Sequence, residues 1–356
     1  MAQKPVVLLI HGMGTHSDAS VKEEFKIGLQ QCMGFFGNNG FDVNNAFALK
    51  TFNYSEYWDE KRKEFASHLN GDIKDSLSLT PSLIQKILDI TAEFDGDDFL
   101  YTHVLDVLFY LTGALRSHQL IKLHKAIGDE IEASINDLNG QRFIIVAHSL
   151  GTAFIHDCLT QLYTHRLDPI NFGLDQLWSV ATVSRLTQMV TRMDDPMSSI
   201  VTDHSSSEPG VCKEFYPVYN DFDPFCCFKR YTRIPNEGLL INTKHVRDLH
   251  KVYQDTNSMR VNPHDLREYF ADPEVGGRFL STNGVVSIDL NDFRAAQAEY
   301  RKTTATGLIT DSYKSIKSKL EELDNISGGV SGMKKKVEIL TEVYKVVDEM
   351  RDEFKI

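Results

Sequence analysis

Ser149 lies within residues 147–151, where one small residue stands two positions before it and another two positions after it. An apolar, β-branched run at residues 143–146 leads into this segment, which predicts a strand that ends at the serine. The pattern is typical of a nucleophile elbow, a strained turn in which larger neighbours would clash with the flanking strand and helix. Glycine usually fills both positions, and Ala147 and Gly151 meet the same steric requirement. The residues therefore predict nucleophilic chemistry at the Ser149 hydroxyl.

A nucleophilic serine needs donors for the oxyanion that forms during acyl transfer. A second apolar run, residues 5–10, ends in residues 11–14, which contain two glycines that let the backbone turn sharply. We expect the N–H of Met13 in that turn to pair with the N–H of Leu150, the residue after the serine. Each donor would contribute on the order of 3 kcal/mol to stabilising the transition state.

A catalytic triad also needs an acid, which in this chain order follows the serine. Residues 214–220 predict a strand that ends in an acidic turn containing Asp221 and Asp223. Asp223 is the preferred acid because Pro224 restricts the loop just beyond it, and Asp221 is the alternative.

The base must follow the acid, which leaves His245, His250 and His264 among the thirteen histidines. His264 is preferred because it lies in a proline-initiated loop that leads into a predicted helix. His245 and His250 remain alternatives, and their surroundings at residues 243–250 have helix-like spacing typical of surface or packing positions. His148 precedes the serine on a strand, so alternation predicts that it faces away from Ser149 and is structural.

Four short motifs stand in the same order along the chain. They are His11-Gly12-Met13-Gly14, Ala147-His148-Ser149-Leu150-Gly151-Thr152, Asn220-Asp221-Phe222-Asp223-Pro224, and His264 followed by Tyr269 and Asp272-Pro273. In this combination the chain resembles the serine esterases and lipases of the α/β-hydrolase superfamily. It is similar within them to the lipase-like serine esterases related to glycosylphosphatidylinositol inositol deacylases. The resemblance covers roughly the first 285 residues discontinuously and implies a deacylase role without naming a substrate.

The resemblance implies an α/β-hydrolase fold: a mostly parallel central sheet with helices on both faces. We expect a catalytic domain over residues 1–290, with a helical insertion at about 55–120, and a C-terminal helical appendage over residues 291–356. Within the insertion, the apolar segment 99–115 is either a cap over the site or an ordinary buried helix, and it is too short and polar for a confident membrane span. The apolar stripe of the last helix packs on the catalytic domain or forms a homodimer.

Composition agrees with an enzyme of this kind. The chain has 356 residues and a formal net charge of −12, which argues against nucleic acid as a partner. The first strand begins so early that no signal peptide is expected. The five cysteines are interpreted as reduced thiols. Both expectations favour a cytoplasmic protein. Adjacent Cys226 and Cys227 are expected to fill space behind the acid loop. No cofactor or metal is expected, since no cluster has metal-ligand spacing.

The residues and the resemblance together predict a serine esterase or lipase that cleaves acyl or lipid esters through an acyl-enzyme intermediate. Ser149 is the expected nucleophile, His264 the base and Asp223 the group that orients the base. Two alternatives stay open. One is a binding or scaffolding protein whose triad no longer works, and the other is a thioesterase or amidase that uses the same three residues.

Overall fold

The structure is a computed structural model. It describes residues 3–12, 16–55, 116–136, 141–165, 174–184, 210–223, 241–247 and 263–304, with single residues at 201, 226, 318, 319, 322, 335, 339 and 342. The apolar segment 99–115, expected to be a cap or a buried helix, lies outside these residues. So do Met13, His250, most of the predicted insertion and most of the predicted appendage.

Six strands form one sheet in the order β2-β1-β3-β4-β5-β6, and every neighbouring pair is parallel. Every residue of β1 and of β4 is buried, as expected for parallel strands covered on both faces. The strands are β1 (Val6–Ile10), β2 (Ala48–Phe52), β3 (Phe143–His148), β4 (Gln176–Val180), β5 (Glu214–Asn220) and β6 (Ile241–Thr243).

Strand register aligns the carboxyl ends of the strands at one edge of the sheet. Ile10, the last residue of β1, pairs with Ala147, and His148, the last residue of β3, pairs with Val180. Because all strands run the same way, the loops that leave β1, β3, β4 and β5 start close together. This edge is where an open parallel sheet can assemble a site from distant segments.

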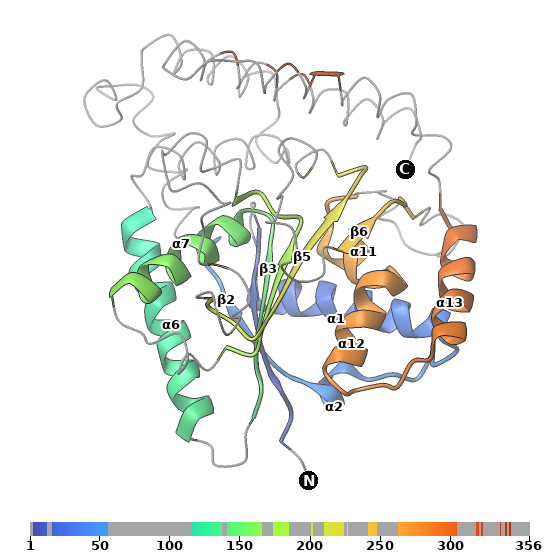
Figure 1. Cartoon of the computed structure of the whole chain (residues 1–356), viewed down its shortest axis with the longest axis horizontal. Helices are drawn as coiled ribbons and strands as arrows, with labels where there is room; N and C mark the ends of the chain where they lie inside the picture. The colour runs from blue at the N-terminus through green and yellow to red at the C-terminus, as the bar shows by residue number, and fades with distance from the viewer. Residues whose placement is uncertain are drawn as a thin grey trace.

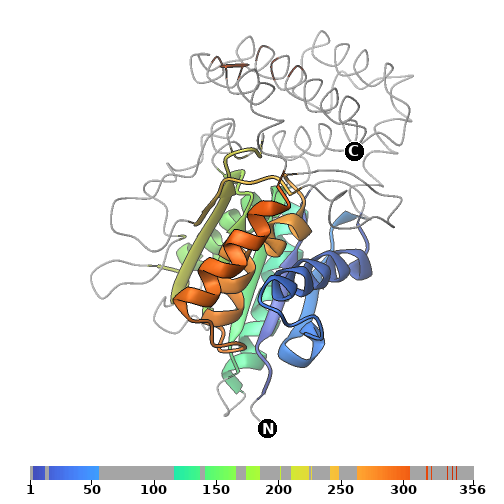
Figure 2. The same ribbon diagram turned by 90° about the vertical axis from the view of Figure 1, so that its right-hand side faces the viewer.

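Helices cover both faces of the sheet (Figure 1). On one face lie α6 and α7, and on the other lie α1, α11, α12 and α13, an arrangement that the turned view in Figure 2 also shows. The structure thus has an α/β architecture of three layers in its described part. The bounds are α1 (Asp18–Phe35), α2 (Val43–Ala46), α6 (Arg116–Asn136), α7 (Leu150–His165), α11 (Leu266–Ala271), the π-helix η4 (Pro273–Gly277), α12 (Arg278–Thr282) and α13 (Leu290–Lys302).

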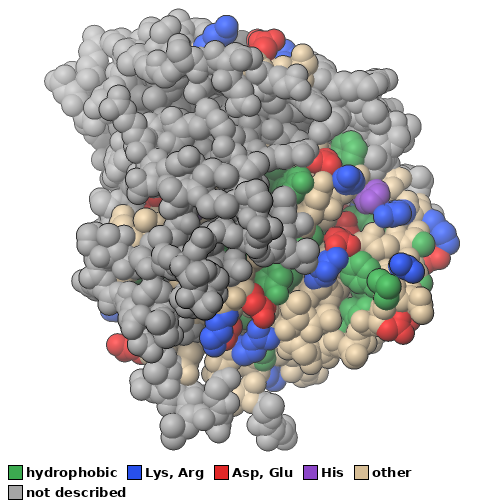
Figure 3. Space-filling model, viewed as in Figure 1, with side chains coloured by type: hydrophobic (Ala, Val, Ile, Leu, Met, Phe, Trp, Pro, Cys, Tyr) green, Lys and Arg blue, Asp and Glu red, His purple; other side chains and the backbone are tan. Residues whose placement is uncertain are grey.

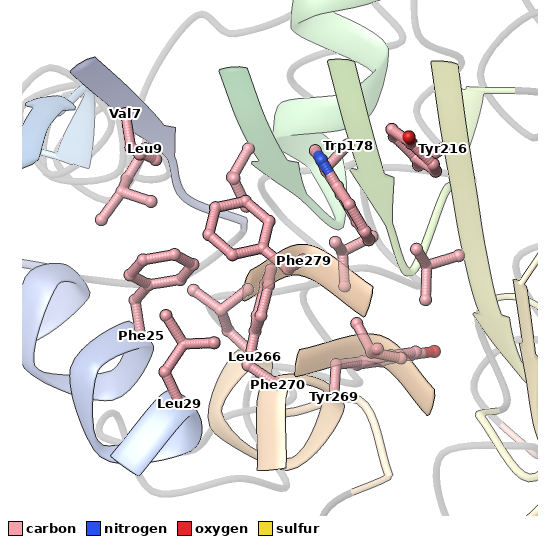
Figure 4. Packing of buried hydrophobic residues seen from close by; sticks show 14 of the residues in the cluster. Val7, Leu9, Phe25, Leu29, Trp178, Tyr216, Leu266, Tyr269, Phe270 and Phe279 are labelled. Carbon is pink, nitrogen blue, oxygen red and sulfur yellow. The ribbon is translucent and has the colours of Figure 1, made fainter. Parts of the chain in front are cut away.

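The core on the α1 face is aromatic (Figure 4). Phe25 of α1 meets Phe270 of α11 edge-on, with ring centroids 4.7 Å apart, and both rings also contact Phe279 of α12. Trp178 of β4 stacks on Tyr216 of β5 at 4.2 Å. Such pairs add specific geometry to the burial of apolar area, so α11 is held at a defined place beneath the strand ends.

Residues 243–250, whose spacing is helix-like, are described as far as Arg247. That part holds the end of β6 and a bridge between Arg247 and Thr304, so pairing with neighbouring backbone prevails over the periodicity there. The helix α13, which begins at the predicted domain boundary, packs on α1 and η4 and buries Ala296 and Tyr300.

Four cysteines are described, namely Cys32, Cys158, Cys212 and Cys226, and all are buried. None of the described helices is both long enough and apolar enough to cross a membrane. On the described part of the face in Figure 3, Lys and Arg side chains are interspersed with Asp and Glu.

Candidate active site

Ser149 lies in the turn between β3 and α7, with a positive φ of 54°. Positive φ is uncommon for a residue other than glycine, and it marks a strained turn held by its surroundings. Here the Ser149 N–H donates to the carbonyl of Val180 at 3.0 Å, and the Ser149 carbonyl accepts from the Thr152 hydroxyl at 2.6 Å. The same hydroxyl accepts from the N–H of Val183 at 3.0 Å, so the turn is tied to the end of β4.

Two glycines allow the turn to pack closely. A Cβ added to Gly151 would lie 2.5 Å from the carbonyl oxygen of His11, and one added to Gly12 would lie 2.6 Å from the Cβ of Ser149. Real Cβ atoms do not approach other atoms so closely. The end of β1 and the start of α7 are therefore in contact at the serine, and both positions require the absence of a side chain.

His264 lies beside Ser149 although 115 residues separate them in the chain. Its Nε2 is 2.7 Å from the Ser149 Oγ, and its Nδ1 is 2.8 Å from Oδ2 of Asp223. The histidine comes just before α11, whose N-cap Asp265 accepts from the N–H of Arg267 at 2.8 Å. Serine, histidine and aspartate thus form one continuous chain of hydrogen bonds, and all three are buried.

Asp223 follows β5 in a turn built by Asn220. The Asn220 side-chain oxygen accepts from the N–H of Phe222 at 2.9 Å, and its carbonyl accepts from the N–H of Asp223 at 3.0 Å. The Asn220 amide group donates to the carbonyl of His245 at 2.8 Å, which ties the turn to the segment after β6. Asn220 is therefore the residue that fixes the acid loop, in the manner of an Asx turn.

Asp221 and His245, two of the alternative candidates, have other partners in the structure. Asp221 accepts a hydrogen bond from Asn242 at 3.2 Å. The ring of His245 lies edge-on to Tyr300, with centroids 6.2 Å apart. Burial lowers the pKa of His245, and the nearby charges of Arg301 and Lys244 lower it further. His250, the other alternative base, lies outside the described residues.

The carboxyl group of Asp223 is fully buried but surrounded by donors. Burial alone would raise its pKa. The charge of His264 and the hydrogen bonds from His264, Tyr269 and Cys226 outweigh burial and bring the pKa of Asp223 below its ordinary value. A carboxylate of this kind stays ionised, so it can orient the imidazole and stabilise it when protonated.

No protein-family model matches this chain, and no curated protein matches it either. Interpretation of the site therefore rests on the geometry of its residues and on their chemistry.

Among the described residues, no group of three or more His, Cys, Asp or Glu side chains is arranged to hold a metal ion.

The predicted oxyanion donors are described in part. Leu150 is the first residue of α7, so its N–H has no acceptor within the helix. Met13 lies outside the described residues, but Gly12 just before it is in contact with Ser149. The Tyr54 hydroxyl lies 2.5 Å from the carbonyl oxygen of His11 and 2.7 Å from that of Gly12. It therefore helps to fix the backbone that follows β1.

Sequence reasoning missed how His148 takes part in the site. Its Nε2–H donates to the backbone carbonyl of His264 at 2.7 Å, and the two rings lie 5.0 Å apart. Alternation along a strand predicted a side chain turned away from Ser149, but the rule applies to regular strand backbone and ends where φ becomes positive. Burial lowers the pKa of His148 to about 3, and the neighbouring His264 contributes, so His148 is a neutral donor.

Tyr54, Tyr269 and Cys226 also contact the site residues or the loops that carry them. Tyr269 belongs to the sequence motif that follows His264, and Cys226 was expected near the acid loop. Tyr54 and Tyr269 are far from their partners in sequence, so their spacing carries no signal of these contacts, whereas Cys226 lies only three residues after Asp223.

Proposed function

We propose that the chain is a serine hydrolase with an α/β-hydrolase fold, and that it cleaves acyl or lipid esters through an acyl-enzyme intermediate. The observation that carries the proposal is the chain of hydrogen bonds from Ser149 Oγ to His264 and on to Asp223, at 2.7 and 2.8 Å. Support comes from the strained turn at Ser149, which presents the hydroxyl beyond the end of β3.

The order of elements supports the same proposal. The serine follows β3, the aspartate follows β5 and the histidine follows β6, and these strands run parallel within one sheet. The order serine, acid, histidine is that of the α/β-hydrolases. The same three residues can also cleave a thioester or an amide.

In the proposed mechanism, the Ser149 Oγ attacks the ester carbonyl while Nε2 of His264 takes its proton. The resulting oxyanion is stabilised by backbone N–H groups, for which Leu150 and Met13 are the candidates. His264 then gives the proton to the departing alcohol, and the acyl group remains on Ser149. Water, deprotonated by His264, hydrolyses the acyl-enzyme and restores the serine.

The proposal is tested by labelling the purified chain with a fluorophosphonate and mapping the modified peptide. We expect modification at Ser149 that is abolished in Ser149→Ala and His264→Ala. We also expect hydrolysis of p-nitrophenyl esters to fall by about 10⁴-fold or more in either variant.

His245→Ala is the matched control, because that residue follows the acid in sequence but lies against Tyr300. It should label and turn over at the wild-type rate. A wild-type chain that is folded yet neither labels nor hydrolyses any ester, thioester or amide in the panel contradicts the proposal and favours a binding protein on this fold.

A further inference from the structure

Two side chains outside the proposed triad donate to the same carboxylate oxygen that faces His264. The Tyr269 hydroxyl donates to Oδ2 of Asp223 at 2.7 Å, and the Cys226 thiol donates to it at 3.2 Å. The Cys226 N–H also reaches Oδ1 of Asp223, at 3.4 Å. Tyr269 and Cys226 are each buried, so these contacts are sheltered from water.

The direction of the Tyr269 hydrogen bond follows from its other partner. The Tyr269 oxygen accepts from the backbone N–H of Asn220 at 3.0 Å, so its own proton is directed to the carboxylate. Burial raises the pKa of Tyr269 well above its usual value, and the charge of Asp223 raises it further. The phenol therefore keeps its proton at neutral pH and remains a donor there. Figure 4 shows its ring extending from α11 into the core.

A buried carboxylate shares its charge among the donors that it contacts. Each proton donated to Oδ2 by the phenol or the thiol reduces the negative charge that this oxygen offers to His264. The same donors restrict where Oδ2 can lie, because Tyr269 is anchored in the aromatic core of α11. The two side chains therefore act on both the position and the basicity of the imidazole through Asp223.

We propose that Tyr269 and Cys226 are positioning residues of the site, which hold Oδ2 of Asp223 against His264 and moderate the basicity of the imidazole. The inference rests on the proposed serine hydrolase activity for its catalytic consequence. It rests on the hydrogen bonds alone for its structural part. Tyr269 is the stronger of the two, since its hydrogen bond is shorter and a phenol is a better donor than a thiol.

The test compares Tyr269→Phe with Tyr300→Phe in the full chain. Tyr300 is the matched control because it is equally buried, lies on α13, and makes no described contact with the triad. With a p-nitrophenyl ester, we expect Tyr269→Phe to lower kcat about tenfold with KM within twofold of wild type. The acidic limb of its pH–rate profile should move to higher pH, because the imidazole opposite a more negative oxygen is protonated more readily.

For the thiol, Cys226→Ala should lower kcat about threefold, and Cys226→Ser, which keeps a donor, should restore most of that loss. Wild-type kcat and pH profile in Cys226→Ala would overturn the part of the inference that concerns Cys226. A Tyr269→Phe chain whose kcat and acidic limb match those of Tyr300→Phe would overturn the inference for Tyr269.

A measurement without substrate separates this inference from the proposed function. The proton on Nδ1 of His264 is observed by NMR and assigned through its absence in His264→Gln. We expect Tyr269→Phe to move that resonance downfield, because Asp223 accepts more strongly once a competing donor is gone, whereas Tyr300→Phe should leave it in place. A downfield shift in a chain with no hydrolase activity sustains the positioning role and contradicts the proposed function. An unchanged resonance in an active enzyme contradicts the positioning role and supports the proposed function.

Discussion

His264 is held at both its side chain and its backbone. Asp223 accepts from Nδ1 of the ring, and His148 donates to the backbone carbonyl. The second contact requires a neutral His148 whose Nε2 carries the proton, because a carbonyl oxygen only accepts. Protonation of His148 would place a second positive charge beside His264 in a site with little access to water.

This contact predicts how stability varies with pH. The pKa of His148 falls from 6.5 to about 3 on folding, chiefly through burial. Between these pH values the unfolded chain binds a proton at His148 that the folded chain does not. The contribution of neutral His148 to the free energy of unfolding is therefore complete above about pH 6.5 and is lost as the pH falls toward 3. In urea unfolding, the advantage of wild type over His148→Gln should shrink by about 4 kcal/mol across that range.

Subtracting the two stability curves cancels the contributions of buried carboxyl groups. Asp272 is one of these: burial raises its pKa to about 7, so it favours the folded state at acidic pH instead. A difference between wild type and His148→Gln that is constant from pH 7 to pH 3 would contradict the neutral state assigned to His148.

The turn from β3 into α7 depends on close contact between backbones. Gly151, in the first turn of α7, faces the carbonyl oxygens of His11 and Ile10 at the end of β1. A side chain there would meet rigid backbone of a central strand and could not be relieved by a rotamer change. The position of the serine is thus set by packing between two elements as well as by its own φ.

Two helical glycines allow a matched comparison. Gly151→Ala should destabilise the fold by about 2 kcal/mol or more and abolish labelling at Ser149, since its Cβ would lie 2.5 Å from a backbone oxygen. Gly128→Ala in α6 meets nothing within 4 Å and should stabilise by about 0.5–1 kcal/mol through helix propensity. Urea unfolding measures both changes. Gly151→Ala with wild-type stability and labelling would contradict the close approach.

A buried ion pair joins segments that are far apart in the chain. The Arg247 guanidinium contacts both carboxylate oxygens of Glu268, at 2.9 and 2.6 Å, and its Nη2 also donates to Gln31 at 2.6 Å. The pair, together with Gln31, connects the segment after β6 with α11 and α1. Both side chains are nearly inaccessible to water, so neither charge is stable there alone.

Glu268→Gln should lower the free energy of unfolding by about 3 kcal/mol, because the substitution leaves the Arg247 charge buried without its counter-ion. The control is Glu299→Gln, which breaks an exposed pair with Lys302 and should change stability by no more than about 0.5 kcal/mol. Equal effects of the two substitutions in chemical denaturation would show that the buried pair contributes no more than a surface one.

Much of the fold could be predicted from local sequence. Apolar runs predicted the strands that became β1 and β3, and the pattern of residues 214–220 predicted the strand that became β5. The three-residue strand β6 is too short to have a pattern of its own, and it exists because β5 offers an edge to pair with. The helix-like spacing of residues 243–247 is overridden in a similar way, since Thr243 pairs with β5 and Arg247 with Thr304.

The sequence by itself determined the type and order of the candidate site residues: a serine between small neighbours, then an acidic turn, then a histidine before a helix. Only the tertiary structure decided which aspartate and which histidine meet, and it brought His148, Tyr54 and Tyr269 into contact with them or with their loops. The physical reason is that strand and turn formation depends on neighbouring residues. Hydrogen bonds between loops instead depend on the register of a parallel sheet, which brings together segments more than a hundred residues apart.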